Sequence, residues 1–241
     1  MTFVTGSCCC DLIFGGRAAD SFFRNNAFRE FGRAGPTVTL VISGELPERH
    51  DDSARSTTMA SATKLLKEEH RSIRAALDFA ERMTSRIARG EEVSPEAVAR
   101  LMEFIHLFVE QCHHAKEERI FFPILERKGI GTWGGPLGMM LAEHERARDL
   151  IQEMKVAAEE YKPGVAKSGE RWAHAAWDYS GLMQAHFGKE EEVLFRMADN
   201  VLTPEEQATI VADFERLEED LGPGKHEQLR ARMSELVSQW A

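Results

Sequence analysis

The sequence has few of the features that mark a secreted or membrane-spanning protein. Its four cysteines are three consecutive residues, Cys8 to Cys10, and the isolated Cys112. They do not form the spaced even set of a disulfide framework, so a reducing compartment fits better. The chain does not open on a basic segment followed by an apolar one, and no run approaches the roughly 18 apolar residues that cross a bilayer. We therefore expect a cytoplasmic protein.

The chain also lacks an excess of positive charge, and strand-forming residues are sparse. The formal net charge of -10 disfavours a phosphate backbone or an anionic membrane as the main partner, because neither offers the opposite charge. The hydrophobic fraction of 43% and the charged fraction of 29% are those of an ordinary globular protein. We therefore expect an all-α protein that binds neither nucleic acid nor membrane, while small ligands remain open.

Residues 1–58 differ from the remainder of the chain. They contain no lysine, six arginines, the three consecutive cysteines and no sustained helical period. Two explanations stay open: a genuine disordered arm, or a translation start assigned too early, with Met59 as the real beginning. In either case we expect an N-terminal extension over residues 1–58 and one domain over residues 59–241.

From Ser61 onward, apolar residues recur every three or four positions, which predicts long amphipathic helices. Proline and glycine signals divide this region into six helices. The predicted helices run from about Ala62 to Ala88, from Ser94 to near Gly129, from Pro136 to Pro163-Gly164, from about Gly169 to Asn200, from Thr203 to Gly222, and from Gly224 to the C-terminus. The first four are predicted to form an antiparallel up-down-up-down four-helix bundle over about residues 62–200. The last two, over about residues 203–241, are predicted to pack across it.

Each half of the predicted bundle carries the same two motifs, a Glu-His pair and then His-x-x-x-Glu. The motifs are Glu69-His70 with His113 and Glu117 in the first half, and Glu143-His144 with His186 and Glu190 in the second. The histidines of each half are 43 and 42 residues apart. Within His-x-x-x-Glu the two side chains lie about 40° apart around a helix. Imidazole and carboxylate together suit iron, manganese or zinc, and carboxylates can bridge two metals, so the motifs predict a metal pair.

The histidines should also lie at one height in the bundle. Side chains equally far from a loop meet at the same level when the joined helices are antiparallel. His70 and His113 lie about 19 and 18 residues from the first loop, and His144 and His186 about 18 and 17 from the third. At about 1.5 Å per residue these differences amount to a few Å. We therefore predict that all four helices bring ligands to one layer.

Four stretches form a more specific pattern. They are Glu69-His70, the run from Cys112 to Pro123, the Gly135 to Leu141 segment before Glu143-His144, and the run from His186 to Phe195. In these stretches the chain resembles the hemerythrin-like family, also known as the HHE cation-binding domain, over roughly Lys64 to Trp240. The resemblance implies two non-haem iron ions, oxo- or hydroxo-bridged. The positions that match the ligands are His70, His113, His114, Glu117, His144, His186 and Glu190.

The second half has Phe187 where the first has His114. The two irons should therefore be unequally coordinated, which leaves one of them an open position for a small ligand. The resemblance implies a protein that binds or senses oxygen, nitric oxide or peroxide, or protects against them. The alternatives are a di-iron enzyme that decomposes peroxide or acts as an oxidoreductase, and a structural domain with zinc or no metal. Structural zinc prefers four thiolate or imidazole ligands, which argues against the last. The sequence identifies no redox partner.

Other residues near these motifs are expected to be structural. Glu118, Glu191 and Glu192 point away from the side of the helix that carries the metal ligands and should face solvent. His106 should be interior or lie just outside the metal ligands, and His226 should lie at the surface or in a local hydrogen bond. Cys112 should be a buried, inert thiol, with a redox role near the irons as the alternative. The residues expected to line the centre and exclude water are Phe104, Phe108, Phe121, Phe122 and Leu194.

Overall fold

The computed structural model describes residues 61–163, 165 and 167–240. The predictions for residues 1–58, including the early start, lie outside this range. The described part of the chain is helical and contains no strand, as the sequence predicted. None of its helices is both long and apolar enough to cross a membrane.

The six predicted helices are all present, and two of them are divided into α-helical and π-helical segments. The first is α1 (Ala62–Ala88). The second comprises α2 (Pro95–Phe104), η1 (Ile105–His114), η2 (Glu117–Phe121) and α3 (Phe122–Arg127). The third is α4 (Pro136–Glu160), and the fourth comprises α5 (Glu170–Lys189), η3 (Glu190–Leu194) and α6 (Phe195–Val201). The last two are α7 (Pro204–Leu221) and α8 (Lys225–Ser238).

The helix ends follow the local signals in the sequence. The Ser61 side chain accepts a hydrogen bond from the Lys64 backbone N–H at 3.2 Å and caps α1. Thr203 and Glu206 form a reciprocal capping box at the start of α7. Between α7 and α8 the backbone of Gly222 and Gly224 has φ values of 129° and 69°, which favour glycine. These residues make the bend that separates the last two helices.

The π-helical segments were not predicted. η1 ends on His113 and His114, η2 begins at Glu117, and η3 begins at Glu190. In a π-helix the backbone N–H bonds to the carbonyl five residues earlier, so each turn is wider than an α-helical one. The sequence-based angles assumed a regular α-helix throughout. The helical turns that carry the predicted ligands of η1, η2 and η3 therefore do not have the α-helical geometry that was assumed.

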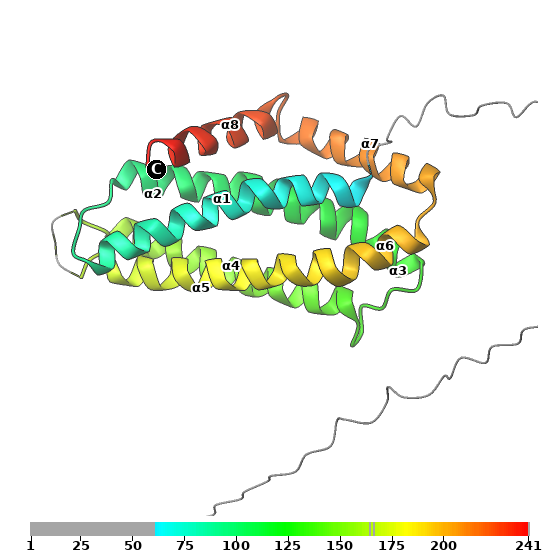
Figure 1. The fold of residues 1–241 in the computed structure, drawn as a ribbon, viewed down its shortest axis with the longest axis horizontal. Coiled ribbons are helices and arrows are strands. Elements are labelled where there is room, and N and C mark those ends of the chain that lie inside the picture. The colour runs from blue at the N-terminus through cyan, green and yellow to red at the C-terminus, as the bar shows by residue number, and fades with distance from the viewer. Residues whose placement is uncertain (1–60, 164, 166, 241) are drawn as a thin grey trace, which may run out of the picture. The chain divides into compact units, whose positions relative to one another are not determined.

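The apolar core is divided into two clusters with the predicted ligands between them. One cluster contains Leu66 before His70 and Leu194 after Glu190, and the other begins at Ile73 on α1. α5 packs against both α1 and α4. α7 contacts α1, η1 and η2, and α8 contacts α1, α2 and η1. Figure 1 shows α7 and α8 end to end along the outside of the bundle. The last two helices therefore cover the side of the bundle on which α1 meets the second helix.

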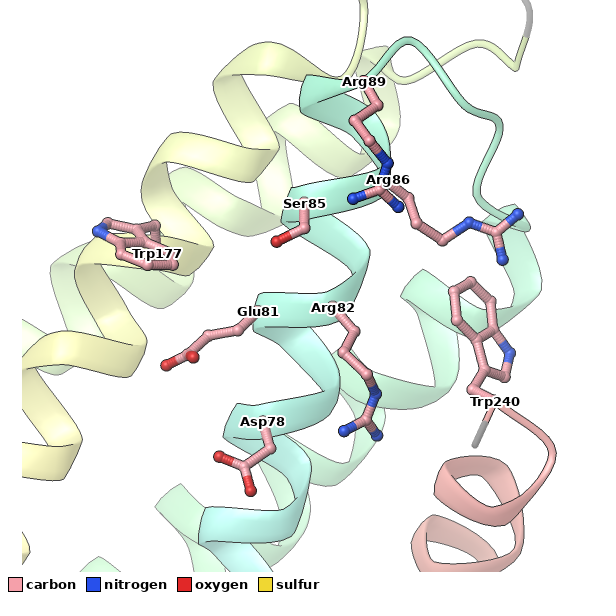
Figure 2. A pocket seen from close by; sticks show the side chains of 8 residues that line it. All are labelled: Asp78, Glu81, Arg82, Ser85, Arg86, Arg89, Trp177 and Trp240. Atoms are coloured by element: carbon pink, nitrogen blue, oxygen red, sulfur yellow. The ribbon is translucent and has the colours of Figure 1, made fainter.

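Trp240, just after α8, attaches the C-terminal end of the chain to α1. Its ring meets the ring of Phe79 edge to face, with centroids 5.1 Å apart. The guanidinium of Arg86 lies 5.0 Å from the Trp240 ring centroid, within the range of a cation–π contact. Figure 2 shows Trp240 and Arg86 on one side of a surface groove and Trp177 on the other. Both ends of α8 are therefore fixed to the bundle, the other end through His226 described below.

Candidate metal centre

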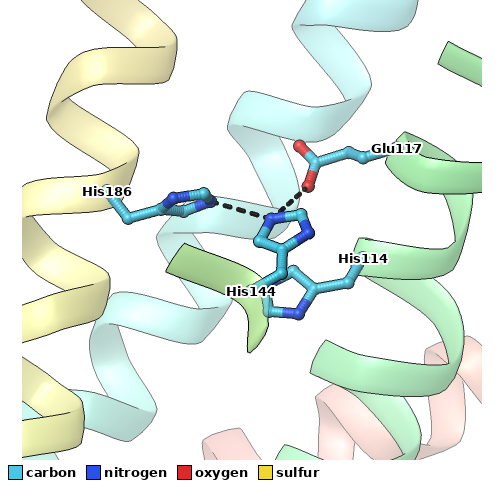
Figure 3. A group of neighbouring side chains, drawn as sticks. All are labelled: His114, Glu117, His144 and His186. Atoms are coloured by element: carbon cyan, nitrogen blue, oxygen red, sulfur yellow. Dashed lines mark hydrogen bonds and ion pairs between the residues drawn. The ribbon is translucent and has the colours of Figure 1, made fainter. Parts of the chain in front are cut away.

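The seven predicted residues gather into two adjacent groups. The two-histidine group is His70, His113, Glu117 and Glu190, and the three-histidine group is His114, Glu117, His144 and His186. In each group the potential ligand atoms lie within 4.8 Å of one another. All seven side chains are buried. Figure 3 shows the three-histidine group converging from α4, α5 and the second helix.

Two glutamates lie between the groups. The Glu117 oxygens are 3.7 Å from His113 Nε2 and 3.5 Å from His144 Nε2. The Glu190 oxygens are 3.2 Å from His70 Nε2 and 3.3 Å from His186 Nε2. In both carboxylates one oxygen faces the two-histidine group and the other faces a histidine of the second group. This is the arrangement that a carboxylate needs to bridge two cations.

His114, the histidine without a counterpart in the second half, belongs to the layer. Its ring stacks on the His144 ring with centroids 3.9 Å apart and an angle of 17° between the planes. Glu110, one turn earlier, lies 2.6 Å from its Nδ1. Because Phe187 takes the matching place on α5 and stacks on His70 at 4.1 Å, the two-histidine group has no third imidazole. The groups are unequal in the way that the sequence indicated.

Each of the five histidines has a carboxylate at Nδ1. The pairs are His70 with Glu191 at 2.7 Å, His113 with Glu69 at 2.8 Å, His114 with Glu110 at 2.6 Å, His144 with Glu118 at 2.7 Å, and His186 with Glu143 at 3.0 Å. We refer to these five glutamates as the outer carboxylates. A neutral imidazole donates its Nδ1–H to such an oxygen, which fixes the tautomer and leaves the Nε2 lone pair facing inward.

The outer carboxylates are in turn balanced by cationic side chains. Arg74 donates to Glu191 at 2.8 Å. Arg148 donates to Glu110 at 2.9 Å and also to Glu118. Lys189 pairs with Glu143, and Lys116 pairs with Glu69. Four cations thus contact the five outer carboxylates, with Arg148 shared by two of them, and keep these carboxylates oriented toward the imidazoles.

The prediction that Glu118 and Glu191 face solvent was wrong. It considered only the angle between each glutamate and the histidine of its own helix. Glu118 instead reaches His144 on α4, and Glu191 reaches His70 on α1. A side chain that points away from the ligands of its own helix can still reach a histidine on a neighbouring helix. Only Glu192 is exposed as predicted.

Burial sets the ionisation of the central side chains. It lowers the pKa of His113 to about 4, and it also lowers the pKa values of His114 and His144. Burial and the adjacent Glu190 raise the pKa of Glu117 well above its ordinary range. Burial opposes the charges of Glu190 and His186 as well, but their mutual attraction lowers the pKa of Glu190 and raises that of His186 to about 9. Binding of a cation here would replace protons.

The inward atoms fit a metal pair. Several are buried and have no hydrogen-bond partner among the described residues: Nε2 of His70, His113 and His114, and both carboxylate oxygens of Glu117 and Glu190. A buried polar atom without a partner costs about 1–3 kcal/mol. In addition, Nε2 of His144 and Nε2 of His186 are 3.1 Å apart, and two lone pairs at this distance repel each other unless a proton or a cation intervenes. Metal cations would satisfy all of these atoms at once.

A family model described as the hemerythrin HHE cation binding domain matches residues 61–198. The chain belongs to this family. No curated protein and no solved structure gives a match to the chain. The matched range of the hemerythrin domain contains both histidine groups and all five outer carboxylates, and α7 and α8 lie beyond it. The cation binding named in the family description agrees with the donor atoms gathered here.

Three further residues of this hemerythrin chain test the remaining sequence predictions. His106 is exposed and its Nε2 lies 3.1 Å from the Gln111 side chain, so the prediction of a residue in the interior or just outside the ligands was wrong. His226 was placed at the surface or in a local contact, but it is buried and bonds to Glu69, 157 residues away. Cys112 is buried, and burial raises the pKa of its thiol to about 12, as expected for an inert cysteine.

Proposed function

We propose that this hemerythrin domain holds two iron ions, oxo- or hydroxo-bridged, between its two histidine groups. The observation that supports this most directly is the position of Glu117 and Glu190, each with one oxygen toward either group. The seven ligands would be His70, His113, His114, His144, His186, Glu117 and Glu190. Five imidazoles with two carboxylates suit iron, whereas structural zinc takes four thiolate or imidazole ligands in a closed tetrahedron.

We further propose that the four long helical runs have the up-down-up-down order of an antiparallel bundle. Support comes from the short connections that join them and from the packing of α5 against both α1 and α4. In this order, residues equally distant from a loop share one level, and the five histidines are such residues. The arrangement explains how motifs so far apart in the sequence meet in one layer.

The proposed role is the binding or sensing of a small oxidant, or protection against it. The two-histidine group has one imidazole fewer, so its ion would keep a position for oxygen, nitric oxide or peroxide. Bound iron supplies that coordination position and reversible electron exchange. The chain supplies the surroundings: Phe187 and Phe195 stack on His70 with centroids 4.1 and 5.6 Å away and limit access of water. The outer carboxylates hold the imidazoles in one tautomer.

The test is anaerobic loading of the full chain with ferrous iron, followed by desalting and a count of iron per chain. Oxygen is then admitted while the optical spectrum is followed, and nitric oxide or peroxide is added to separate samples. We expect two irons per chain and a colour change that reverses when oxygen is removed. Catalytic gas release from peroxide would indicate an enzyme instead. A chain that retains no iron, or that retains zinc in preference to iron, would contradict the proposal.

A further inference from the structure

Lys116 is a buried lysine beside the proposed iron ligands. It lies one residue before Glu117 and its side chain is 1% exposed. Its ammonium contacts one oxygen of Glu69 and one oxygen of Glu218. Burying an ammonium is costly unless opposite charges surround it, so these two carboxylates are what allow Lys116 to lie inside. One of them belongs to α1 and the other to α7.

The contact extends into α8. His226 Nε2 lies 3.0 Å from the same Glu69 oxygen that meets Lys116, and the His226 ring stacks on Phe108 with centroids 4.7 Å apart. Glu69, Cys112, Glu218 and His226 also form a third group of potential metal ligands. The ammonium of Lys116 already contacts two of its carboxylates and supplies the positive charge there. This group is therefore a salt-bridged cluster that joins α1, η1, α7 and α8.

Through Glu69, the cluster contacts His113, an imidazole of the two-histidine group. One oxygen of Glu69 meets Lys116 and His226, and the other accepts the hydrogen bond from His113 at 2.8 Å. The other four outer carboxylates differ, because their balancing cations Arg74, Arg148 and Lys189 are partly exposed. Among the described residues, Glu69 is thus the outer carboxylate that is fixed by helices outside the matched family range.

We infer that Lys116 is a positioning residue that acts on His113 through Glu69. Glu218 of α7 holds the Lys116 ammonium, and His226 of α8 contacts the same Glu69 oxygen. The C-terminal helix pair then acts on one ion of the pair, the one with the position for a small ligand. This inference rests on the proposed function. Its physical basis is that an outer partner fixes the orientation of a ligating histidine and increases its basicity. Without the ammonium, Glu69 and Glu218 would repel each other and Glu69 would turn from His113.

The experiment compares full-length variants loaded with ferrous ⁵⁷Fe under anaerobic conditions. Iron per chain is counted, and Mössbauer spectra are recorded, since two unequal iron environments give two doublets. The test variants are Lys116→Met and the milder Glu218→Gln. Glu219→Gln, on the exposed neighbour of Glu218, is the matched control. Arg148→Met is the contrast, because Arg148 contacts the acceptors of His114 and His144 in the other group.

We expect Lys116→Met to weaken binding of one iron by about 10–100-fold, the range for loss of an outer partner. One doublet should shift or disappear while the other stays, and Glu218→Gln should shift the same doublet. Arg148→Met should act on the other doublet, and Glu219→Gln on neither. If Lys116→Met does not fold, Glu218→Gln decides. If neither doublet changes in the test variants, or if both doublets shift equally, this inference is overturned while the proposed function stands. A wild-type chain without iron would overturn the proposed function and this inference with it.

Discussion

His70 and Glu191 face each other at 2.7 Å across the interface of α1 and η3. Glu190, the preceding residue, approaches the opposite nitrogen of the same ring at 3.2 Å. Two consecutive glutamates thus contact the two nitrogens of one imidazole: Glu190 from the side of the metal centre and Glu191 from outside it. Arg74 donates to the outer one and keeps it in place. The pair defines the orientation of His70 before any metal binds.

Glu191→Ala should therefore weaken iron binding by about 10–100-fold, because loss of the acceptor frees the His70 ring and its tautomer. Glu118→Ala should do the same through His144. A ferrous titration under anaerobic conditions measures the effect. Glu192→Ala, on the exposed neighbour, is the control and should bind iron as the wild type does. Equal affinities for Glu191→Ala and Glu192→Ala would mean that the outer carboxylates have no part in metal binding.

Substitution of Glu117 or Glu190, the proposed bridging carboxylates, should have a larger effect on iron binding than substitution of an outer carboxylate. Glu117→Ala or Glu190→Ala is expected to reduce the stoichiometry from two irons toward one or none. A shared carboxylate offsets the repulsion between two cations, so its loss affects both ions. Iron per chain after loading and desalting measures this, and circular dichroism checks that the helices remain. The prediction fails if either variant retains two irons.

The helices and the ligand layer could be predicted from the sequence because their signals are local and repeated. Apolar spacing and residues such as Pro95, Gly90 and Thr203 defined the helix limits to within a few residues. The 43 and 42 residue spacings between the histidines predicted that four helices carry their ligands at one level. Both arguments need only the geometry of a helix and the length of a loop.

The outer carboxylates and the C-terminal cluster could not be predicted in this way. Glu118 and Glu191 act on histidines of other helices, and His226 acts on Glu69, so their roles depend on which helices are neighbours. The periodicity of a single helix does not contain that information. The π-helical turns added a second error, because they change the angle between residues that a 3.6-residue turn would fix. One signal was present: glutamate directly precedes both His70 and His144.

Ferrous iron should stabilise the folded apoprotein. The unpartnered Nε2 atoms and the oxygens of Glu117 and Glu190 converge only in the folded state, so the metal binds the folded chain in preference to the unfolded one. At a free concentration 100 times the dissociation constant, one site adds about 2.7 kcal/mol to the free energy of unfolding. Thermal melts with and without iron measure this. Magnesium, which prefers oxygen ligands, is the control, and equal stabilisation by magnesium would contradict the prediction.

The stability of the apoprotein should depend on pH in both directions. His113 has a pKa of about 4 in the folded chain and 6.5 without its surroundings, so the unfolded chain binds more protons between these values. The free energy of unfolding therefore falls as the pH is lowered from 6.5 to 4. His114 and His144 shift in the same direction, whereas Glu117 opposes them. Glu110, whose pKa burial also raises, opposes them as well, but the lowered pKa values of Glu69, Glu190 and Glu191 add to the loss, so we expect a net loss of stability in acid.

On the alkaline side His186 and Glu117, whose pKa values are both raised, lose their contributions as the pH rises. The pKa of His186 is raised to about 9, so its contribution is complete below pH 6.5 and is lost as the pH rises toward 9. Urea midpoints of the apoprotein should consequently be highest near neutral pH. A His186→Gln variant should show a smaller decline above pH 6.5 and keep the decline in acid. An apoprotein whose midpoint rises steadily from pH 6.5 to 9 would show that the His186 proton is not held by the folded chain.

The three π-helical segments lie in the second and fourth helical runs and make the length of these two runs matter to a single residue. Deleting one residue within η1, ahead of His113, would let regular α-helical hydrogen bonds resume. Because a π-helical turn holds one residue more than an α-helical turn, that change would absorb the deletion and keep His113, His114 and Glu117 close to their present direction relative to Phe104. The same deletion within α2, which is already α-helical, would instead turn the three ligands by about 100° and take them out of the centre. The two deletions would thus separate the local π-helical hydrogen bonding from the direction of the ligands, a distinction that no substitution of a ligand makes.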